Sequence, residues 1–564
     1  MHSTTSKTLI GRLVPAGAAA VACFFIATAQ AAAPGIAGTT FNLTAQPASL
    51  NQPDGETVYS WGYGCVSTTG QTYVGVTANA NCPTMQVPGP TLVVTEGTTV
   101  TVNLTNNLPT AAGNTSMLFP GFHVTAVAGT GVPGLLTQEA APGGTVSYTF
   151  VASSPGTRSY YSGTQGDLQV EMGLYGAIIV LPSSAPAVCT AGLPGVAPGN
   201  NARAQAQWHE SDFRLAAAAY DHPGTCYDRE YLFQFAEMDP NIHRQALAQV
   251  TARAGCVAGA IGCSLEVPTE PYHPAYFLIN GRSMPDDMDG NYAAEYPHQP
   301  YNGNPHMHPG EQVLLRVIGQ GRWQHPFHEH ANHVRILARD GNLILSSSTV
   351  TYQGTATAAP ALAGRLEFTT NTTPGEAFDG IFYFTGRGLN WDMYGHHPGS
   401  IDPLATLPCT PDVNGYNTGA PTAVNYFEWC QDHNKPLEVN PLGDMPGGGP
   451  ATLPNANIFA NGAWYGGSPY LGPDATLRSD TTLRNDTAGS SGCVTGTAGT
   501  ATSTPNCSNL LPSNTQANPS NERAFAFMWH SHNEREITTN NVFPGGMFMM
   551  MLVDSREFVI DESN

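Results

Sequence analysis

Histidines carry the clearest chemical signal in this chain of 564 residues. Six of its 18 histidines lie in two short segments, HPFHEHANH and WHSH, namely His325, His328, His330, His333, His530 and His532. On an extended strand, residues i and i+2 project to the same face, so each His-x-His pair presents two imidazoles side by side. Two such strands that meet would bring four ring nitrogens together, which suits copper, zinc, iron or nickel better than magnesium or calcium.

A lone histidine is usually a satisfied core or surface residue. That interpretation is the default for the scattered histidines, such as His209, His222, His243 and His433. Chance is a poor explanation for two His-x-His pairs beside strand-forming sequence in one region. The two pairs are therefore the candidate metal ligands.

The elements that position these residues are predicted to be strands. The chain has 61 Gly, 45 Pro and only 11% charged residues, with Thr- and Val-rich runs between turn-forming residues. This composition favours many short strands over a helical bundle. Strand-like segments fall at 92–104, 145–151 and 175–181 in a first set, and at 230–238, 276–280, 312–318, 333–338, 365–370, 378–385, 524–529 and 547–553 in a second. One short helix is predicted at 242–253.

The two sets of strands predict two β-sandwich domains. They span residues 36–190 and 230–564 and are joined by a loop region at 191–229. Between about 387 and 521 the sequence is dense in Gly, Pro, Asn and Thr, and we interpret this span as one insertion into the second domain. A separate third domain is the alternative.

The first 31 residues indicate export. Two basic residues precede an apolar run from Leu13 to Ala29, which ends at the cleavage site Ala29-Gln30-Ala31. The mature chain is expected to begin near Ala32 and to be periplasmic, secreted or attached at the cell surface. No other stretch is long and apolar enough to span a bilayer.

Cysteine usage agrees with an oxidising compartment. Removing Cys23 with the leader takes the 11 cysteines to ten, an even number. The spacing suggests sequential pairs, although sequence sets the count and not the partners. These pairs are Cys65–Cys82, Cys189–Cys226, Cys256–Cys263, Cys409–Cys430 and Cys493–Cys507. None lies in a C-x-x-C motif, so structural zinc and dithiol redox chemistry are disfavoured.

The charge balance excludes one large class of function. With 21 basic and 42 acidic residues, the formal net charge is −21. Such a chain offers no polyanion-binding face for DNA, RNA or anionic lipid. An acidic surface instead favours cations.

Four segments together resemble the copper motifs of the multicopper oxidase family, which is built from cupredoxin β-sandwich domains. In the family's order they are SMLFPGFH, GTRSYYSGTQGDLQVEMGLYGAIIV, HPFHEH and WHSHNEREITTNNVFPGGMFM. The resemblance implies an all-β fold, with two cupredoxin-like Greek-key β-sandwich domains and a long disulfide-stapled insertion in the second. It also implies copper as the cofactor.

The chain departs from the family at the fourth motif. The family has a cysteine between two histidines and a third histidine four residues later, whereas this chain has Ser531 and Glu536 at those places. A hydroxyl cannot supply the copper–thiolate bond of a blue type-1 centre, so no intense blue colour is expected. His325 matches the remaining histidine of that centre, and Met547 lies near its axial position.

A second departure removes part of the family's three-copper cluster. Tyr161 and Gly163 stand at the two ligand places of the second motif, and the first motif keeps at most His123. The resemblance carries over four ligands from the intact third and fourth motifs: His328, His330, His530 and His532. They suffice for one metal centre or two loosely held ions, with His325, His333 or His123 as secondary ligands.

Two functional hypotheses follow. The first is an exported copper-dependent oxidoreductase with a reduced mono- or dinuclear centre, a small-molecule or metal-ion substrate, and dioxygen as a candidate reactant. Glu536 and Glu329 are its candidate proton carriers or hydrogen-bond partners of the imidazoles. The second is a non-catalytic copper-binding, sequestering or surface structural protein. Two-domain relatives of the family form trimers, so a homotrimer is an open option.

Overall fold

The computed structural model describes the chain over residues 33–66, 72–74, 85–127, 130–190, 218–351, 358–384, 408–413, 415–417, 428–430, 467–470, 524–554 and 560. The predicted signal peptide and most of the predicted insertion lie outside these residues.

The first part of the chain forms two five-stranded sheets. Its strands are β1 (Gly35–Ala37), β2 (Thr40–Asn51), β3 (Thr57–Val66), β4 (Thr72–Val74), β5 (Leu92–Thr95), β6 (Thr99–Asn106), β7 (Thr125–Ala126), β8 (Val132–Pro133), β9 (Gln138–Glu139), β10 (Thr145–Val151), β11 (Gly156–Tyr161) and β12 (Tyr175–Leu181). The strand orders are β11-β12-β5-β1-β4 and β3-β2-β6-β10-β7, and β8 and β9 form a separate pair.

Alternating side chains explain why these sheets pack face to face. In β6, Val100, Val102 and Leu104 are buried, whereas the residues between them are exposed or half-buried. Leu92 and Val94, from β5 of the other sheet, are buried in the same apolar core. Because successive side chains of a strand point to opposite faces, this pattern gives each sheet one apolar face, and the two faces close a sandwich.

The segment 92–104, predicted as one run of strand, is divided in the structure. β5 and β6 belong to different sheets, and the chain turns between them. Gly97 lies in this turn with a φ of +80°, a conformation that side chains with a Cβ rarely adopt. The single glycine in an otherwise strand-forming run therefore marks the change of sheet.

The later part of the chain forms a second pair of sheets. Its strands are β13 (Arg229–Met238), β14 (Tyr276–Ile279), β15 (His306–Met307), β16 (Gln312–Gly319), β17 (His325–Glu329), β18 (Val334–Arg339), β19 (Asn342–Leu343), β20 (Leu345–Thr351), β21 (Ala358–Leu362), β22 (Leu366–Glu367), β23 (Thr369–Thr372), β24 (Ala377–Tyr383), β25 (Gly467–Tyr470), β26 (Ala524–Ser531) and β27 (Phe548–Asp554). One sheet has the order β14-β13-β16-β24-β18-β19, with β22 beside β18. The other has the order β15-β27-β26-β17-β23, with β25 beside β26, and β20 pairs with β21.

Aromatic rings join the two sheets of this second sandwich. Phe233 of β13, Phe327 of β17 and Trp529 of β26 meet edge to face, with ring centroids 6.1 to 6.4 Å apart. All three side chains are buried in one apolar core. The neighbours of Phe327 and Trp529 along β17 and β26 therefore project from the other face of the sheet. This is the face that carries the His-x-His pairs.

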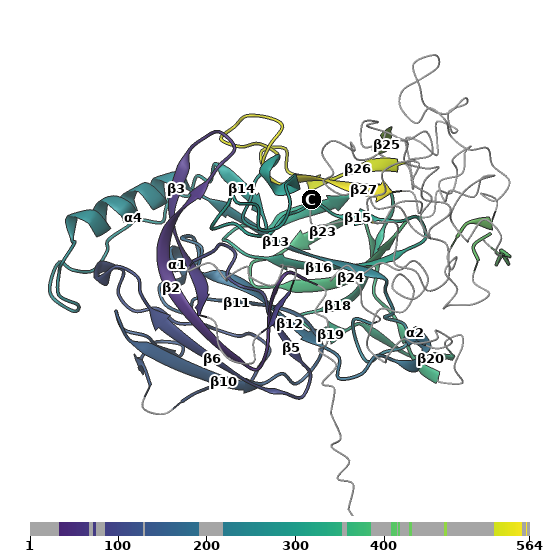
Figure 1. The fold of residues 1–564 in the computed structure, drawn as a ribbon, viewed down its shortest axis with the longest axis horizontal. Coiled ribbons are helices and arrows are strands. Elements are labelled where there is room, and N and C mark those ends of the chain that lie inside the picture. Colours follow the sequence, from purple (N-terminus) through teal and green to yellow (C-terminus); the bar gives the residue numbers. More distant parts are fainter. Residues whose placement is uncertain are drawn as a thin grey trace, which may run out of the picture.

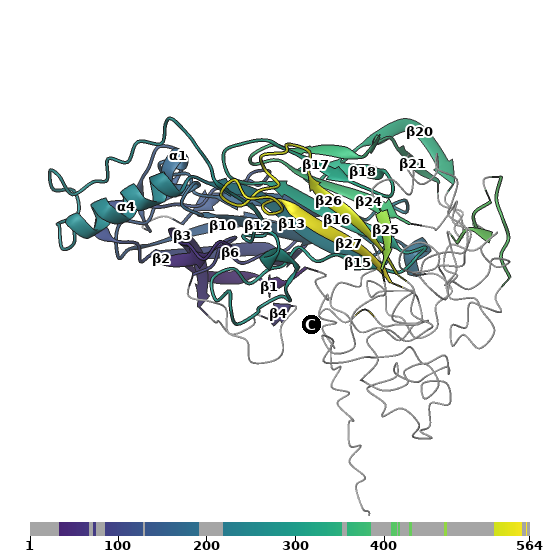
Figure 2. The same ribbon diagram turned by 90° about the horizontal axis from the view of Figure 1, so that it is seen from above.

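The two sandwiches lie side by side along the long axis of the molecule, the first in purple and blue and the second in teal to yellow (Figures 1 and 2). β11 of the first contacts β16 and β24 of the second. The hydroxyl of Thr157 on β11 donates to Asp379 Oδ1 of β24 at 2.6 Å. Arg316 of β16 forms an ion pair with the same carboxylate at 3.6 Å. Buried polar contacts thus join the sandwiches.

One helix crosses from the later part of the chain to the first sandwich. The predicted helix at 242–253 corresponds to α4 (Pro240–Ala252), and the Asp239 side chain caps its N-terminus by accepting from the amide of Asn241. Ile242 and Ala246 of this helix are buried in the core of the first sandwich, and α4 lies beside β3 (Figure 1). The remaining short helices are η1 (Thr110–Ala112), α1 (Gly166–Gln169), α2 (Ala187–Thr190) and η2 (Asp286–Met288).

The fold confirms the predicted all-β class with two β-sandwiches and disulfide bonds. Three predicted pairs are present: Cys189–Cys226, Cys256–Cys263 and Cys409–Cys430. Cys65 is also disulfide-bonded. Its predicted partner Cys82 and the predicted pair Cys493–Cys507 lie outside the described residues. No helix in the described parts of the chain is long and apolar enough to cross a bilayer.

Candidate metal centre

The two His-x-His pairs lie on neighbouring strands. β17 and β26 pair in antiparallel fashion, with Phe327 opposite Ser531, His328 opposite His530, and Glu329 opposite Trp529. Residues directly opposite each other in an antiparallel pair have their side chains on the same face, close together. The register of this ladder therefore brings imidazoles from two distant parts of the sequence to one place.

Three of these imidazoles form a compact cluster, which we call the imidazole cluster: His328, His330 and His530. One ring nitrogen from each lies within 4.8 Å of the others. The Nε2 atoms of His330 and His530 are 3.2 Å apart. Nitrogen ligands about 2 Å from a metal ion lie roughly 3 Å from one another in a tetrahedral or square arrangement. The His330–His530 spacing is thus that of two ligands on one metal ion, and a nitrogen of His328 lies within 4.8 Å of both.

His532 lies at the rim of this cluster. Its ring centroid is 4.7 Å from that of His328 and 5.8 Å from that of His530. Its side chain is exposed, whereas those of His328 and His330 are buried. The structure therefore brings together all four histidines of the two pairs, three as a tight group and the fourth toward solvent.

The electrostatics of the imidazole cluster favour neutral rings. Burial, reinforced by the neighbouring imidazoles of His330, His530 and His532, lowers the pKa of His328 to about 4. Burial also lowers the pKa of His530. A neutral imidazole keeps the lone pair that a metal ion needs. These rings are therefore in the ligating state at neutral pH.

Hydrogen bonds fix the orientation of two of these rings. Nδ1 of His530 donates to the backbone carbonyl of Ser531 at 2.7 Å, so its Nε2 is the atom that faces His330. A hydrogen bond of 2.6 Å joins Nδ1 of His328 to the hydroxyl of Thr369 on β23. Partners of this kind set the tautomer and direction of metal-ligating histidines.

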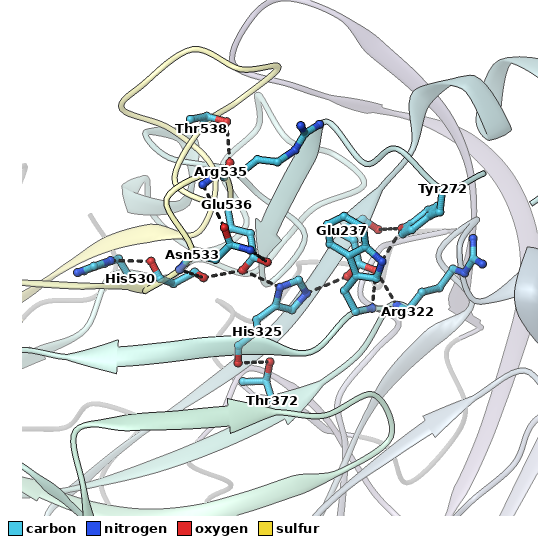
Figure 3. A network of polar contacts seen from close by, with 12 residues as sticks. Glu237, Tyr272, Arg322, His325, Thr372, His530, Asn533, Arg535, Glu536 and Thr538 are labelled. Carbon is cyan, nitrogen blue, oxygen red and sulfur yellow. Dashed lines mark hydrogen bonds and ion pairs between the residues drawn. The ribbon is translucent and has the colours of Figure 1, made fainter. Parts of the chain in front are cut away.

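His325 lies outside the imidazole cluster, although it is on the same strand. Its Nδ1 is 2.9 Å from Glu536 Oε2, and its Nε2 is 2.9 Å from Glu237 Oε2 (Figure 3). Burial alone lowers the pKa of His325, but the hydrogen bonds and negative charges of the two glutamates outweigh it and raise this pKa to about 9. At neutral pH the ring is an imidazolium that donates from both nitrogens, so it has no lone pair for a metal.

The two glutamates that hold His325 are themselves held by the surrounding chain. Glu237 Oε1 accepts from the backbone amides of Arg322 and Trp323 at 2.7 and 2.8 Å. Glu536 accepts from the Ser531 hydroxyl at 2.5 Å and from Asn533 Nδ2 at 2.8 Å. Figure 3 shows this network running from the strand of His530 to Arg322. We call Glu237, His325 and Glu536 the carboxylate–histidine triad.

The place that the family resemblance assigns to a blue copper centre does not fit that ion. Ser531 supplies a hydroxyl that is bonded to Glu536, and both nitrogens of His325 are bonded to carboxylates. Met547 is buried in the apolar core of the second sandwich. A blue centre requires a thiolate and two neutral imidazoles. The residues present instead hydrogen-bond to one another, with His325 between two carboxylates.

The structure does not bring the remaining predicted residues into the imidazole cluster. His333 is half-buried and packs against Phe368, with ring centroids 4.9 Å apart. His123 is exposed in the first sandwich. Glu536 is buried, and the contacts described for its carboxylate go to His325, Ser531 and Asn533 rather than to an imidazole of the cluster.

Sequence reasoning missed Glu237. A signal was present, because EYLFQFAEM places the carboxylate of Glu237 between the apolar residues Ala236 and Met238. The whole of β13 is buried, and a buried charge must be paired. The partner could not be identified from sequence, since His325 lies 88 residues further along the chain.

Comparisons with known proteins place part of the chain in a family. Residues 67–185 match the family model described as multicopper oxidase. Multicopper oxidase MCE of Talaromyces pinophilus is 36% identical over 98 residues, which are 17% of this chain and 15% of that protein. The matched part therefore spans less than a fifth of that relative. The residues that match the family model lie in the first sandwich.

Two solved structures align with this chain at low sequence identity and with TM-scores below 0.5. The blue copper oxidase from Nitrosomonas europaea is 15% identical, with a TM-score of 0.40 over 91% of this chain and 85% of that chain. The laccase from Botrytis aclada is 19% identical, with a TM-score of 0.33 over 62% of this chain and 47% of that chain.

Proposed function

Because the chain belongs to the multicopper oxidase family, we propose that it is an exported copper-dependent oxidoreductase. Its centre is mononuclear or dinuclear, is held by the imidazole cluster, and lacks a blue type-1 copper. The observation that carries this proposal is the convergence of three imidazole nitrogens within 4.8 Å.

Copper fits the donor set of the imidazole cluster. Imidazole nitrogens suit copper among the first-row metals, and burial keeps the rings of His328 and His530 in the ligating state. Bound copper would supply one-electron chemistry, accepting electrons from a reductant and passing them to dioxygen. Zinc fits the same geometry, so metal content belongs in the first experiment.

The chain's own residues set how reactants reach the centre. His328 and His330 are buried and hold the inner side, whereas His532 is exposed at the rim. A small molecule can therefore approach from the side of His532. The formal charge of −21 favours cationic or neutral reductants, such as a metal ion or a phenol, over anions.

Metal content, paramagnetic resonance and oxygen consumption test the proposal together. We expect protein loaded with copper to hold one or two ions tightly, to show nitrogen couplings without an intense blue band, and to consume oxygen with a phenolic or ferrous reductant. His530→Ala removes a ligand and should abolish both the signal and the turnover. Copper-saturated protein that consumes no oxygen with any reductant would contradict the proposal.

The loss of the thiolate position supports a second candidate function. Ser531 stands where the family has its cysteine, so the usual route for electrons into the cluster is missing. On this alternative the protein binds or sequesters copper without turnover. Several weakly held ions favour sequestration, whereas one or two tight ions favour the oxidoreductase.

Location and assembly are part of the proposal. The signal peptide predicted at 1–31 supports export to the periplasm, the cell surface or the medium, and cell fractionation of the tagged chain measures this. A homotrimer is testable by light scattering of the purified protein.

A further inference from the structure

The spacing of the imidazole cluster depends on a short strand pairing. β17 and β26 are paired over three residue pairs. Two further backbone bonds flank this pairing, from the His532 amide to the Pro326 carbonyl at 2.7 Å and from the His330 amide to the Met528 carbonyl at 3.3 Å. A slip of one residue would turn every side chain of a strand to the opposite face. Such a slip would separate His328 from His530, so something must hold the register.

A buried side-chain bridge joins these strands beside the cluster. Glu536 Oε2 accepts from the hydroxyl of Ser531, which is the neighbour of His530 on β26. The same oxygen is 2.9 Å from Nδ1 of His325, at the start of β17. One carboxylate oxygen therefore links the strand of His328 and His330 to the strand of His530.

The bridge is built from strong components. Its three side chains, those of Ser531, Glu536 and His325, are 0 to 1% exposed. Hydrogen bonds to charged groups are stronger than neutral ones, and a buried pair that loses one partner leaves an uncompensated charge. Glu237 of β13 holds the other nitrogen of His325, which anchors β17 to the opposite sheet of the sandwich.

We propose that Glu536 is a positioning residue for the metal centre, acting through Ser531 and His325 to lock β17 against β26. The bridge keeps the pair His328 and His330 facing the pair His530 and His532 at ligating distance. This inference rests on the proposed function, because it assigns the lock to the same metal site.

Two variants and one control test the lock. Ser531→Ala removes a single buried hydroxyl and so cuts the link to β26, whereas Glu536→Gln removes the charge that both strands share. Glu171→Gln is the matched control. Glu171 is equally buried and accepts a hydrogen bond of 2.6 Å from Tyr272, which belongs to the network drawn in Figure 3. It has no described contact with either strand. All three should be folded by circular dichroism.

Copper(II) affinity is measured by competition with a chelator. Loss of an outer partner of a metal ligand typically lowers affinity by about 10- to 100-fold, and we expect a fall in that range for Ser531→Ala and Glu536→Gln. We expect Glu171→Gln to stay within about threefold of the native protein. The nitrogen couplings of the copper signal should weaken only in the first two variants.

Hydrogen exchange of the metal-free protein supplies a readout that needs no copper. Peptides that contain 325–329 and 524–532 should exchange faster in Ser531→Ala and Glu536→Gln than in Glu171→Gln. If the native protein binds no copper while exchange rises selectively, the proposed function fails and the lock stands. The lock is overturned if exchange in these peptides is unchanged, or if the control alters exchange and affinity as much as the two variants do.

Discussion

Two histidines of one strand are driven to opposite protonation states. His325 and His328 are both buried in β17, yet the pKa of His325 is raised to about 9 and that of His328 is lowered to about 4. They are three residues apart, an odd separation, so they project from opposite faces of the strand. One face offers two carboxylates and the other offers more imidazoles.

The difference shows that the neighbours of a buried histidine decide whether it can hold a metal. Burial disfavours the charged ring at both positions, but only at His325 do two glutamates outweigh it. The resulting imidazolium supplies the positive charge within the carboxylate–histidine triad. The neutral rings of His328 and His530 keep their lone pairs and can bind a metal cation.

The largest expected effect is the loss of a ligand from the imidazole cluster. His530→Ala should lower copper affinity by more than about 100-fold, because it removes one of the three converging nitrogens. His333→Ala is the matched control, since this nearby ring is outside the cluster, and its affinity should stay within about threefold. Chelator competition measures both, and equal losses would remove the distinction between cluster and neighbour.

The second largest effect is expected from a substitution in the carboxylate–histidine triad rather than in the imidazole cluster. Glu237→Leu leaves the buried imidazolium with one carboxylate, and we expect it to lower the free energy of unfolding by about 3 to 5 kcal/mol. The control is Glu270→Gln, whose ion pair with Arg322 involves an exposed carboxylate and should matter by less than about 1 kcal/mol. Urea denaturation of the metal-free variants measures both values.

The pH dependence of stability sharpens the comparison. The pKa of His325 is raised in the folded chain from its ordinary value of 6.5 to about 9, so the unfolded chain releases this proton first as pH rises. The stabilisation is complete below pH 6.5 and is lost as pH rises through about 9, a loss of about 3 kcal/mol for this group. The urea midpoint of unfolding should therefore fall between pH 6 and 10. In His325→Gln the midpoint should change less over the same range.

The smallest effect lies on the acid side of the imidazole cluster. Protons compete with metal ions for a ring only near or below its pKa, and that of His328 is lowered to about 4. Copper affinity should therefore change by less than about tenfold between pH 7 and 5.5. The titration needs a buffer that does not bind copper. A steep loss of copper affinity across that interval would show that the pKa values of the ligating rings are not lowered.

Part of the site was predictable because its ligands are close in sequence. His-x-His on a strand places two imidazoles on one face whatever the rest of the fold does. The alternation of β6, with Val100, Val102 and Leu104 inward, likewise predicts a half-buried strand from local sequence alone. The split of 92–104 into two strands was not predicted, because it depends on which sheet accepts each strand after Gly97.

The carboxylate–histidine triad could not be predicted from local sequence patterns. Glu237, His325 and Glu536 are separated by 88 and 211 residues, and nothing in their immediate sequences states that they meet. From sequence, His325 was a candidate ligand and Glu536 a candidate proton carrier. In the structure, Glu536 is the hydrogen-bond partner of His325 within this triad.

From residue types and spacing alone, two strands can be predicted to display a pair of imidazoles each. The same reading shows that Ser531 offers a hydroxyl where a blue copper centre needs a thiolate. Only the tertiary structure decided which histidines stay neutral and which one holds an extra proton. The physical reason is that periodicity along a strand is local, whereas the charge and dielectric around a buried ring come from side chains that only folding brings near.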